Sequence, residues 1–127
     1  MANFYGNCRS NYVRAKNPKR FKQILEEYDV NIIETQDELI GFVSTCESGM
    51  PYHNELACDI CDDQRIPKLL AEGETFIILE IGSEKERYYI GYAVAVNHDG
   101  RQCHVNLNEI YSRAKAIFGT NPTEASY

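Results

Sequence analysis

The sequence lacks the patterns that place a chain in a membrane or direct its export. No run of apolar residues approaches the roughly 18 residues that a membrane-spanning helix needs. The first residues also lack the succession of a positive segment, an apolar segment and a small-residue cleavage site that marks a secretory signal. We therefore expect a cytoplasmic protein. Its five cysteines fit that compartment if most stay reduced, because the cytosol disfavours disulfides and an odd number cannot pair completely.

The sequence also lacks the short motifs of well-known catalytic sites. It contains no glycine-rich phosphate loop, no Gly-x-Ser-x-Gly elbow and no His-Glu-x-x-His pair. Cys103 and His104 are adjacent in a predicted strand, so their side chains point to opposite faces and do not form a nucleophile–base pair. We therefore expect a protein that is not an enzyme and that needs no cofactor.

Negative charge is absent from the first 25 residues. This stretch has no acidic residue and six basic ones, namely Arg9, Arg14, Lys16, Lys19, Arg20 and Lys22. The 127-residue chain still has a formal net charge of −6, because residues 26–81 hold 14 acidic and two basic residues while residues 82–127 hold five of each. We expect this polarity to persist whatever secondary structure the segments form, because it belongs to whole segments.

The length and the alternation of patterns indicate one globular domain, residues 1–127. Three apolar stretches in the second half are separated by turn signals, which is typical of antiparallel strands joined by hairpins. The sequence therefore predicts an α+β fold, with a mainly antiparallel sheet of about five or six strands and two long helices and one short helix packed on it. We expect strands near residues 9–15, 30–34, 38–44, 75–81, 87–96 and 101–107, and helices after Asn17 and near residues 65–72 and 108–118.

Two of these elements have apolar patterns that indicate burial. The segment 75–81 reads TFIILEI and alternates little, so it suits a central strand covered on both faces. The last helix has an apolar face, which we expect to pack on the sheet and which consists of Ile110, Ala114, Ile117 and Phe118.

The first helix combines a good start with an unfavourable charge. Asn17 is a suitable N-cap and Pro18 fits the first helical position, where its missing N–H costs nothing. Lys19 and Arg20 then occupy the first turn, where the helix dipole favours negative charge. The partner of these cations is predicted to lie in the acidic segment of the same fold, in a second copy of the chain or in another molecule.

The segment from residue 46 to residue 63 has no clear period and is predicted to be a long loop. It holds four candidate metal ligands within 16 residues, Cys46, His53, Cys58 and Cys61. Such ligands suit a tetrahedral zinc site, but zinc signatures have two short ligand pairs and this segment has only Cys58-x-x-Cys61. The alternative interpretation is a set of reduced cysteines at the edge of a loop, with no metal.

The charge distribution favours a protein partner over nucleic acid. The basic end offers Tyr5 and Tyr12 for stacking on bases, but the larger acidic surface would repel phosphates. A basic, nucleic-acid-handling protein fits the acidic segment better, and charge complementarity would set its rate of encounter and its specificity. The predicted partner-binding residues are Glu26, Glu27, Asp59, Asp62 and Asp63, together with Arg9 and Tyr12 from the basic end.

Four stretches resemble a family of small, mostly uncharacterised accessory proteins that are encoded on plasmids, integrative elements and prophages. They are FYGNCRSNYVRAKN, the Gly73-Glu74 strand entry, EKERYYIGYAVAV and LNEIYSRAKAIFG, and together they span most of the chain. The resemblance implies a mobile genetic element as the context, where accessory proteins often counter host defences. It suggests a protein similar in kind to anti-CRISPR and antirestriction proteins, which act by binding a host complex.

Two alternatives remain beside this binding role. One is a metal-dependent protein centred on Cys46, His53, Cys58 and Cys61. The other is a homo-oligomeric structural protein, in which the basic first helix of one copy meets the acidic segment of another.

Overall fold

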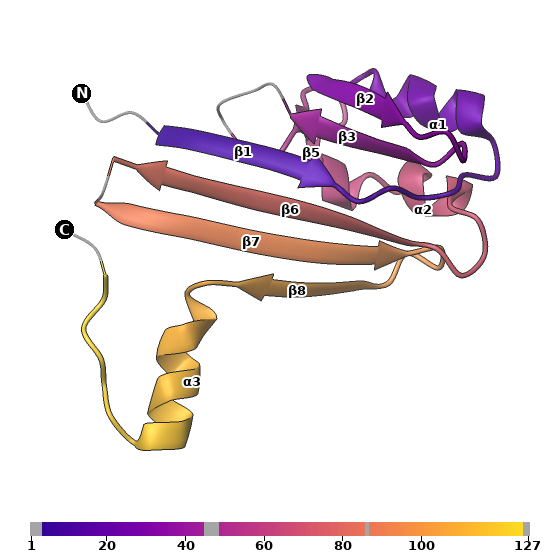
Figure 1. Cartoon of the computed structure of the whole chain (residues 1–127). Coiled ribbons are helices and arrows are strands. Elements are labelled where there is room, and N and C mark those ends of the chain that lie inside the picture. The colour runs from indigo at the N-terminus through magenta and orange to yellow at the C-terminus, as the bar shows by residue number, and fades with distance from the viewer. Residues whose placement is uncertain (1–3, 45–48, 86, 126–127) are drawn as a thin grey trace.

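The computed structural model describes residues 4–44, 49–85 and 87–125. Its main sheet has six strands in the order β2-β3-β1-β6-β7-β8, and every neighbouring pair is antiparallel (Figure 1). These strands are β1 (Phe4–Ser10), β2 (Val30–Glu34), β3 (Ile40–Ser44), β6 (Thr75–Glu84), β7 (Tyr88–Asn97) and β8 (Gln102–Asn106). A separate two-stranded hairpin pairs β4 (Tyr52–His53) with β5 (Cys58–Asp59).

The helices are α1 (Pro18–Leu25), the 3-10 turn η1 (Ile60–Asp62), α2 (Arg65–Leu69) and α3 (Glu109–Phe118). The α+β class and the antiparallel sheet predicted from the sequence are confirmed. The two helices predicted to be long have 8 and 10 residues, so each makes only two to three turns. Among the described residues, no helix is both long enough and apolar enough to cross a membrane.

Helix α1 begins as its sequence predicts. The side chain of Asn17 accepts a hydrogen bond from the backbone N–H of Arg20 at 3.1 Å, and Pro18 occupies the first position. Phe21, Ile24 and Leu25 are buried, because their spacing places them on one face of the helix. Helix α1 thereby contributes three large side chains to the core.

Strand β1 lies earlier in the sequence than the predicted span of 9–15, because at Asn11 a set of side-chain and backbone hydrogen bonds takes the place of regular strand pairing. Its backbone N–H donates to Ile77 O at 3.0 Å, while its side chain accepts from Ile77 N at 2.8 Å and donates to Thr75 O at 3.0 Å. These bonds hold the chain against β6 without strand geometry. Beyond this point only isolated bridges remain, from Val13 to Ile40 and from Ala15 to Leu70.

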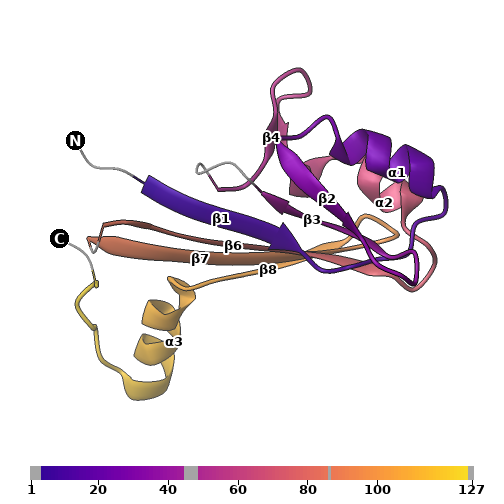
Figure 2. The ribbon, with the colours of Figure 1, turned by 45° about the horizontal axis from the view of Figure 1, so that its top comes forward.

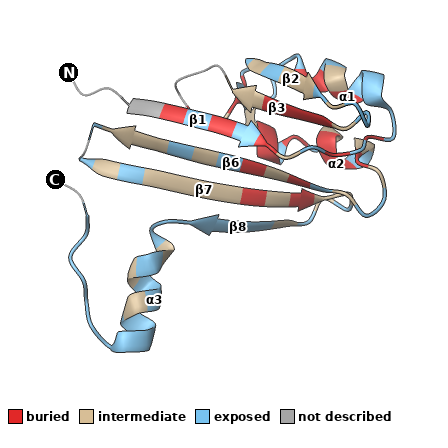
Figure 3. Ribbon diagram, in the orientation of Figure 1, coloured by how far each residue is buried: buried red, intermediate tan, exposed pale blue. Residues whose placement is uncertain are grey.

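The core lies under one end of the sheet and on one of its faces. Helices α1 and α2 cover this face, and the buried positions gather at their end of the strands (Figure 3). Its largest fully buried side chains include Phe21, Phe42, Phe76, Ile24, Leu25 and Ile78. The rings of Phe21 and Phe76 meet edge to face, with their centroids 5.8 Å apart.

Strand β6 is central, between β1 and β7, but the prediction that both of its faces are covered is wrong. Phe76 and Ile78 face the core and are 1% and 0% exposed. Leu79 and Ile81 belong to the opposite face and are 46% and 61% exposed. An apolar strand is normally covered on both sides, and here the second cover is missing.

Helix α3 differs from its prediction in the same way. Its range agrees with the sequence pattern, yet none of its residues is buried. Figure 2 shows α3 beyond the β8 edge of the sheet, at the other end of the molecule from α1 and α2. The apolar face of this helix is therefore present but does not pack on the sheet of its own chain.

Candidate functional site

A network of polar side chains joins the end of α1 to the start of α2. Tyr28 donates its hydroxyl to Asp63 Oδ2 at 2.7 Å. Arg65 donates to both oxygens of Asp63, at 3.0 and 2.8 Å, and to both oxygens of Glu27, each at 3.1 Å. His53 Nε2 lies 2.8 Å from Glu27 Oε1. We call these five residues, Glu27, Tyr28, His53, Asp63 and Arg65, the polar network.

The local sequence places Asp63 at the centre of this network. Asp63 follows η1 directly, and its Oδ1 also accepts the backbone N–H of Arg65 at 3.0 Å. Its side chain is therefore fixed before α2 begins, as in an Asx-type turn. The carboxylate is only 1% exposed, so it depends on these partners in place of water.

His53 is engaged at both ring nitrogens. Its Nδ1 accepts the backbone N–H of Leu56 at 3.0 Å, so the ring proton lies on Nε2 and is donated to Glu27. The ring also meets Tyr28 edge to face at 5.4 Å. In this arrangement neither nitrogen is free to bind a metal or to accept a proton from a substrate.

Charge pairing controls the acidity of the two carboxylates. Hydrogen bonds from Arg65 and then His53 hold the pKa of Glu27 below its ordinary value. Burial acts to raise the pKa of Asp63, but hydrogen bonds from Arg65 and Tyr28 outweigh it and hold that pKa below its usual range. Both groups are thus anions that the fold itself neutralises through one guanidinium.

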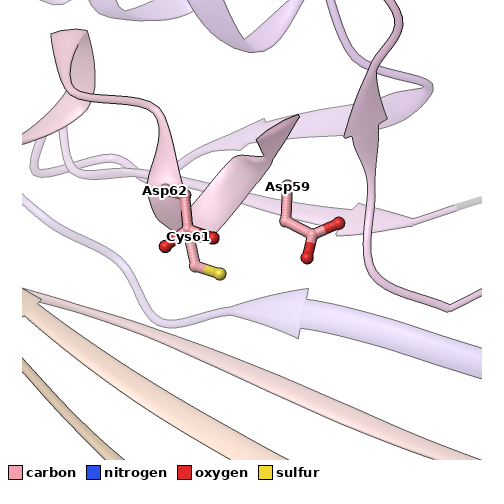
Figure 4. Close-up of side chains that lie close together, drawn as sticks. All are labelled: Asp59, Cys61 and Asp62. Carbon is pink, nitrogen blue, oxygen red and sulfur yellow. The ribbon is translucent and has the colours of Figure 1, made fainter. Parts of the chain in front are cut away.

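A second acidic cluster forms no ion pair with a cation in the described part of the chain. Oxygen atoms of Asp59 and Asp62 and the sulfur of Cys61 all lie within 4.8 Å of one another (Figure 4). Burial first, and then the charge of Asp62, raise the pKa of Asp59. Burial and both carboxylates raise the pKa of Cys61 to about 12. This thiol therefore stays protonated at neutral pH, which does not suit a redox Cys-x-x-Cys.

The predicted metal ligands do not come together as one group in the described part of the chain. Cys46 lies outside the described residues. His53 and Cys58 are paired across the β4–β5 hairpin, and His53 belongs to the polar network. Over residues 4–44, 49–85 and 87–125, the only close group of three or more candidate ligands is Asp59, Cys61 and Asp62.

The predicted partner-binding acids divide into two kinds. Glu27 and Asp63 are bound to Arg65 inside the fold, and Asp63 is 2% exposed. Glu26 and Asp62 are exposed, Asp59 is half-buried, and none of the three has an ion pair among the described residues. Only this second set presents free negative charge to a partner.

Arg9 and Tyr12 lie on the other face of the sheet. Arg9 pairs across β6 with Leu79, on the face opposite the core, while its neighbours Cys8 and Ser10 are buried. Its guanidinium donates to the Tyr12 hydroxyl at 3.2 Å and lies 5.8 Å from the centre of that ring. The structure therefore separates these two residues from the five acids.

The basic first segment finds few partners inside the fold. Lys22 forms an ion pair with Glu34 at 3.1 Å. The other five cations of this segment are exposed and form no ion pair with any described residue, namely Arg9, Arg14, Lys16, Lys19 and Arg20. The unfavourable charge at the start of α1 is thus not compensated within the described chain.

Sequence reasoning missed Arg65 and Tyr28. Arg65 is one of two cations in a segment with 14 acids, and this imbalance was a usable signal that it neutralises buried carboxylates. Tyr28 is an aromatic residue just after the first helix, and its ring is buried in the core while its hydroxyl binds Asp63. Amphipathic side chains of this kind serve both roles.

Comparisons with protein-family models, with curated proteins and with solved structures found no match to this chain.

Proposed function

We propose that the protein acts by binding another protein, through an acidic surface formed by Glu26, Asp59 and Asp62. Its partner is a basic, nucleic-acid-handling host complex, and the setting is a mobile genetic element that counters host defence. In this role the protein is a stoichiometric inhibitor of the anti-CRISPR or antirestriction kind and performs no reaction.

The uncompensated acidic cluster is the observation that carries the proposal. Asp59 and Asp62 lie close together and form no ion pair with a described cation, and burial first and then the charge of Asp62 raise the pKa of Asp59. An Arg or Lys side chain from a partner would relieve this repulsion and would gain charge-assisted hydrogen bonds. The polar network gives the contrast, because Arg65 already supplies that cation to Glu27 and Asp63.

The test is an affinity pull-down of the tagged protein from host lysate, at low and at moderate salt, with mass-spectrometric identification. Asp62→Lys and Glu26→Lys reverse exposed charges on the acidic surface. Glu124→Lys is the matched control, since it makes the same charge change in the C-terminal tail, away from α1 and α2 (Figure 1).

We expect one basic complex to be captured at low salt, to be lost as salt rises, and to be lost with Asp62→Lys but not with Glu124→Lys. Capture that changes neither with salt nor with Asp62→Lys would contradict binding through the acidic surface. Recovery of the tagged protein alone would contradict the binding role in that host.

A divalent cation is a second candidate for the same cluster, because it would relieve the same repulsion. Two carboxylates and one thiol provide three of the four ligands that a tetrahedral zinc site needs. Metal content measured on protein purified without chelator separates the two ideas. Stoichiometric metal that Asp59→Asn removes would favour the metal-dependent reading, and metal near zero would leave the cluster to a protein partner.

A further inference from the structure

We propose that two copies of this chain form a dimer in which α3 of each copy packs into an apolar groove on the sheet of the other. The proposal uses surfaces distinct from the acidic surface, so it stands or falls separately from the proposed function. It rests on two apolar surfaces that one copy leaves exposed, a groove on the sheet and a stripe on a helix.

The first surface is a groove on the open face of β6, β7 and β8. Its volume is about 290 Å³, and it is lined chiefly by Leu79, Ile81, Gly91, Ala93, Val105 and Leu107. The register places Gly91 opposite Ile81 and Ala93 between Leu79 and Val105. Ala93 therefore lies low between larger side chains, and Leu107 leans over Gly91, in an apolar groove of the kind that receives an amphipathic helix.

The second surface is the apolar stripe of α3. Ile110, Ala114, Ile117 and Phe118 recur at helical spacing and so share one face. Ile110, Ile117 and Phe118 are 61%, 75% and 73% exposed. A short amphipathic helix has little stability by itself, so a stripe of this kind indicates that something packs against it.

The two surfaces do not cover each other within one chain. Helix α3 starts directly after Leu107 and Asn108, and Leu107 is itself part of the groove rim. A connection this short does not leave the helix room to turn back over the rim from which it starts. A second copy has no such restriction, and a two-fold axis makes both exchanges at once, which closes the assembly.

The exposed area is sufficient for a dimer. Eight large apolar side chains of these surfaces and their margins are each 46% to 75% exposed: Leu79, Ile81, Tyr89, Val105, Leu107, Ile110, Ile117 and Phe118. Together they expose on the order of 800 Å² per chain, which matches the roughly 800 Å² that each partner buries in a standard interface.

The first test is sedimentation equilibrium of the full chain at low and at high salt. We expect twice the chain mass in both, because apolar contacts do not weaken with salt. A monomer at all accessible concentrations would overturn the proposal. A dimer that dissociates at high salt would overturn it too, and would support the charge-matched oligomer instead.

Two double variants test which surfaces are involved. Ile117→Lys with Phe118→Lys disrupts the helix stripe, and lysine suits the last turn of a helix. Leu79→Thr with Ile81→Thr disrupts the groove while keeping a residue type that favours strands. Leu56→Lys is the control, since Leu56 is 48% exposed but lies in the turn between β4 and β5. Circular dichroism checks that each variant is folded.

We expect both double variants to have the mass of one chain and Leu56→Lys to remain a dimer. Mixing the two double variants is the decisive step, because one intact helix then meets one intact groove and restores a heterodimer. If only the α3 variant dissociates, the contact is helix to helix, and if only the groove variant dissociates, it is sheet to sheet. Either result, or a mixture that stays monomeric, would overturn the exchange.

Discussion

The guanidinium of Arg65 serves two carboxylates at once, and one of them has almost no access to water. Asp63 is 1% exposed at its side chain, and Glu27 is held on the other side of the same group. Removing one member of a buried ion pair leaves a charge without compensation, which costs more than the pair itself contributes. Arg65 is therefore the residue at which the acidic segment is most sensitive to substitution.

We expect Arg65→Ala to lower the free energy of unfolding by about 2–3 kcal/mol, below the range for a fully buried pair because the side chains of Arg65 and Glu27 are 32% and 37% exposed. Arg65→Lys should give an intermediate loss, because it keeps the charge but not the forked geometry. Arg113→Ala is the matched control, since its ion pair with Glu109 on α3 is exposed and is worth less than about 0.5 kcal/mol. Urea denaturation measures all three, and equal losses for Arg65→Ala and Arg113→Ala would contradict the role of the network.

The polar network also predicts how stability depends on pH. The pKa values of Glu27 and Asp63 are lower in the folded state than in the unfolded chain, so their contribution is present above the unfolded values of about 4 and is lost as pH falls through the folded values. We expect the free energy of unfolding to fall as the pH drops below about 4. Urea melts over a pH series measure this slope. The slope should be shallower for Asp63→Asn than for the native chain, and an unchanged slope would show that other carboxylates dominate.

Two glycines in the sheet differ in how much room they leave. A Cβ at Gly41 of β3 would lie 2.5 Å from the backbone oxygen of Asn11 and 2.8 Å from the Tyr12 ring. A Cβ at Gly91 of β7 would meet Leu107, but only at an exposed side chain that can move. The close approach at Gly41 therefore constrains the backbone where the chain leaves β1.

We expect Gly41→Ala to cost about 1–3 kcal/mol of stability, as overpacking does when backbone must shift. Gly91→Ala should cost clearly less, because Leu107 can change rotamer. Thermal or urea unfolding of the two variants side by side measures the difference, and a Gly91→Ala loss as large as that of Gly41→Ala would contradict this explanation.

The start of α1 carries charge that its stability does not require. Lys19 forms no ion pair with a described residue, and a negative side chain in the first turn would interact better with the helix dipole. We expect Lys19→Glu to raise the free energy of unfolding by about 0.3–1 kcal/mol. The control is Lys22→Glu, which breaks the ion pair with Glu34 and should lower it. A loss of stability with Lys19→Glu, in chemical denaturation at low salt, would place a structural partner for Lys19 within the fold.

At the scale of the whole molecule, local sequence patterns predicted most helices and strands. They failed where contacts between segments distant in the sequence determine the structure. The strand at residues 30–34 and the last helix follow from spacing and caps, and both occur nearly as predicted. The sequence did not predict that Leu79 is exposed or that the apolar stripe of α3 is unpacked, because an apolar pattern indicates burial but does not identify the surface that covers it. The polar network was not predicted for a related reason, because Arg65 and Glu27 are 38 positions apart and no short motif links them.

The two halves of the β6–β7 hairpin belong to one hydrogen-bonded ladder, but only one half is packed against the core. On the face that meets the core, Phe76, Ile78 and Val94 of the inner half are buried, whereas Gly82 and Ile90 of the outer half are only half-buried. Hydrogen exchange should register this division, because opening the outer half leaves the core intact. In the variant with Ile117→Lys and Phe118→Lys, we expect amides of the inner half to exchange only with global unfolding and those of the outer half far sooner. Equal protection of amides along the hairpin would contradict this expectation. Amides of the outer half that exchange more slowly in the native chain than in this variant would identify the strand positions that the second copy covers.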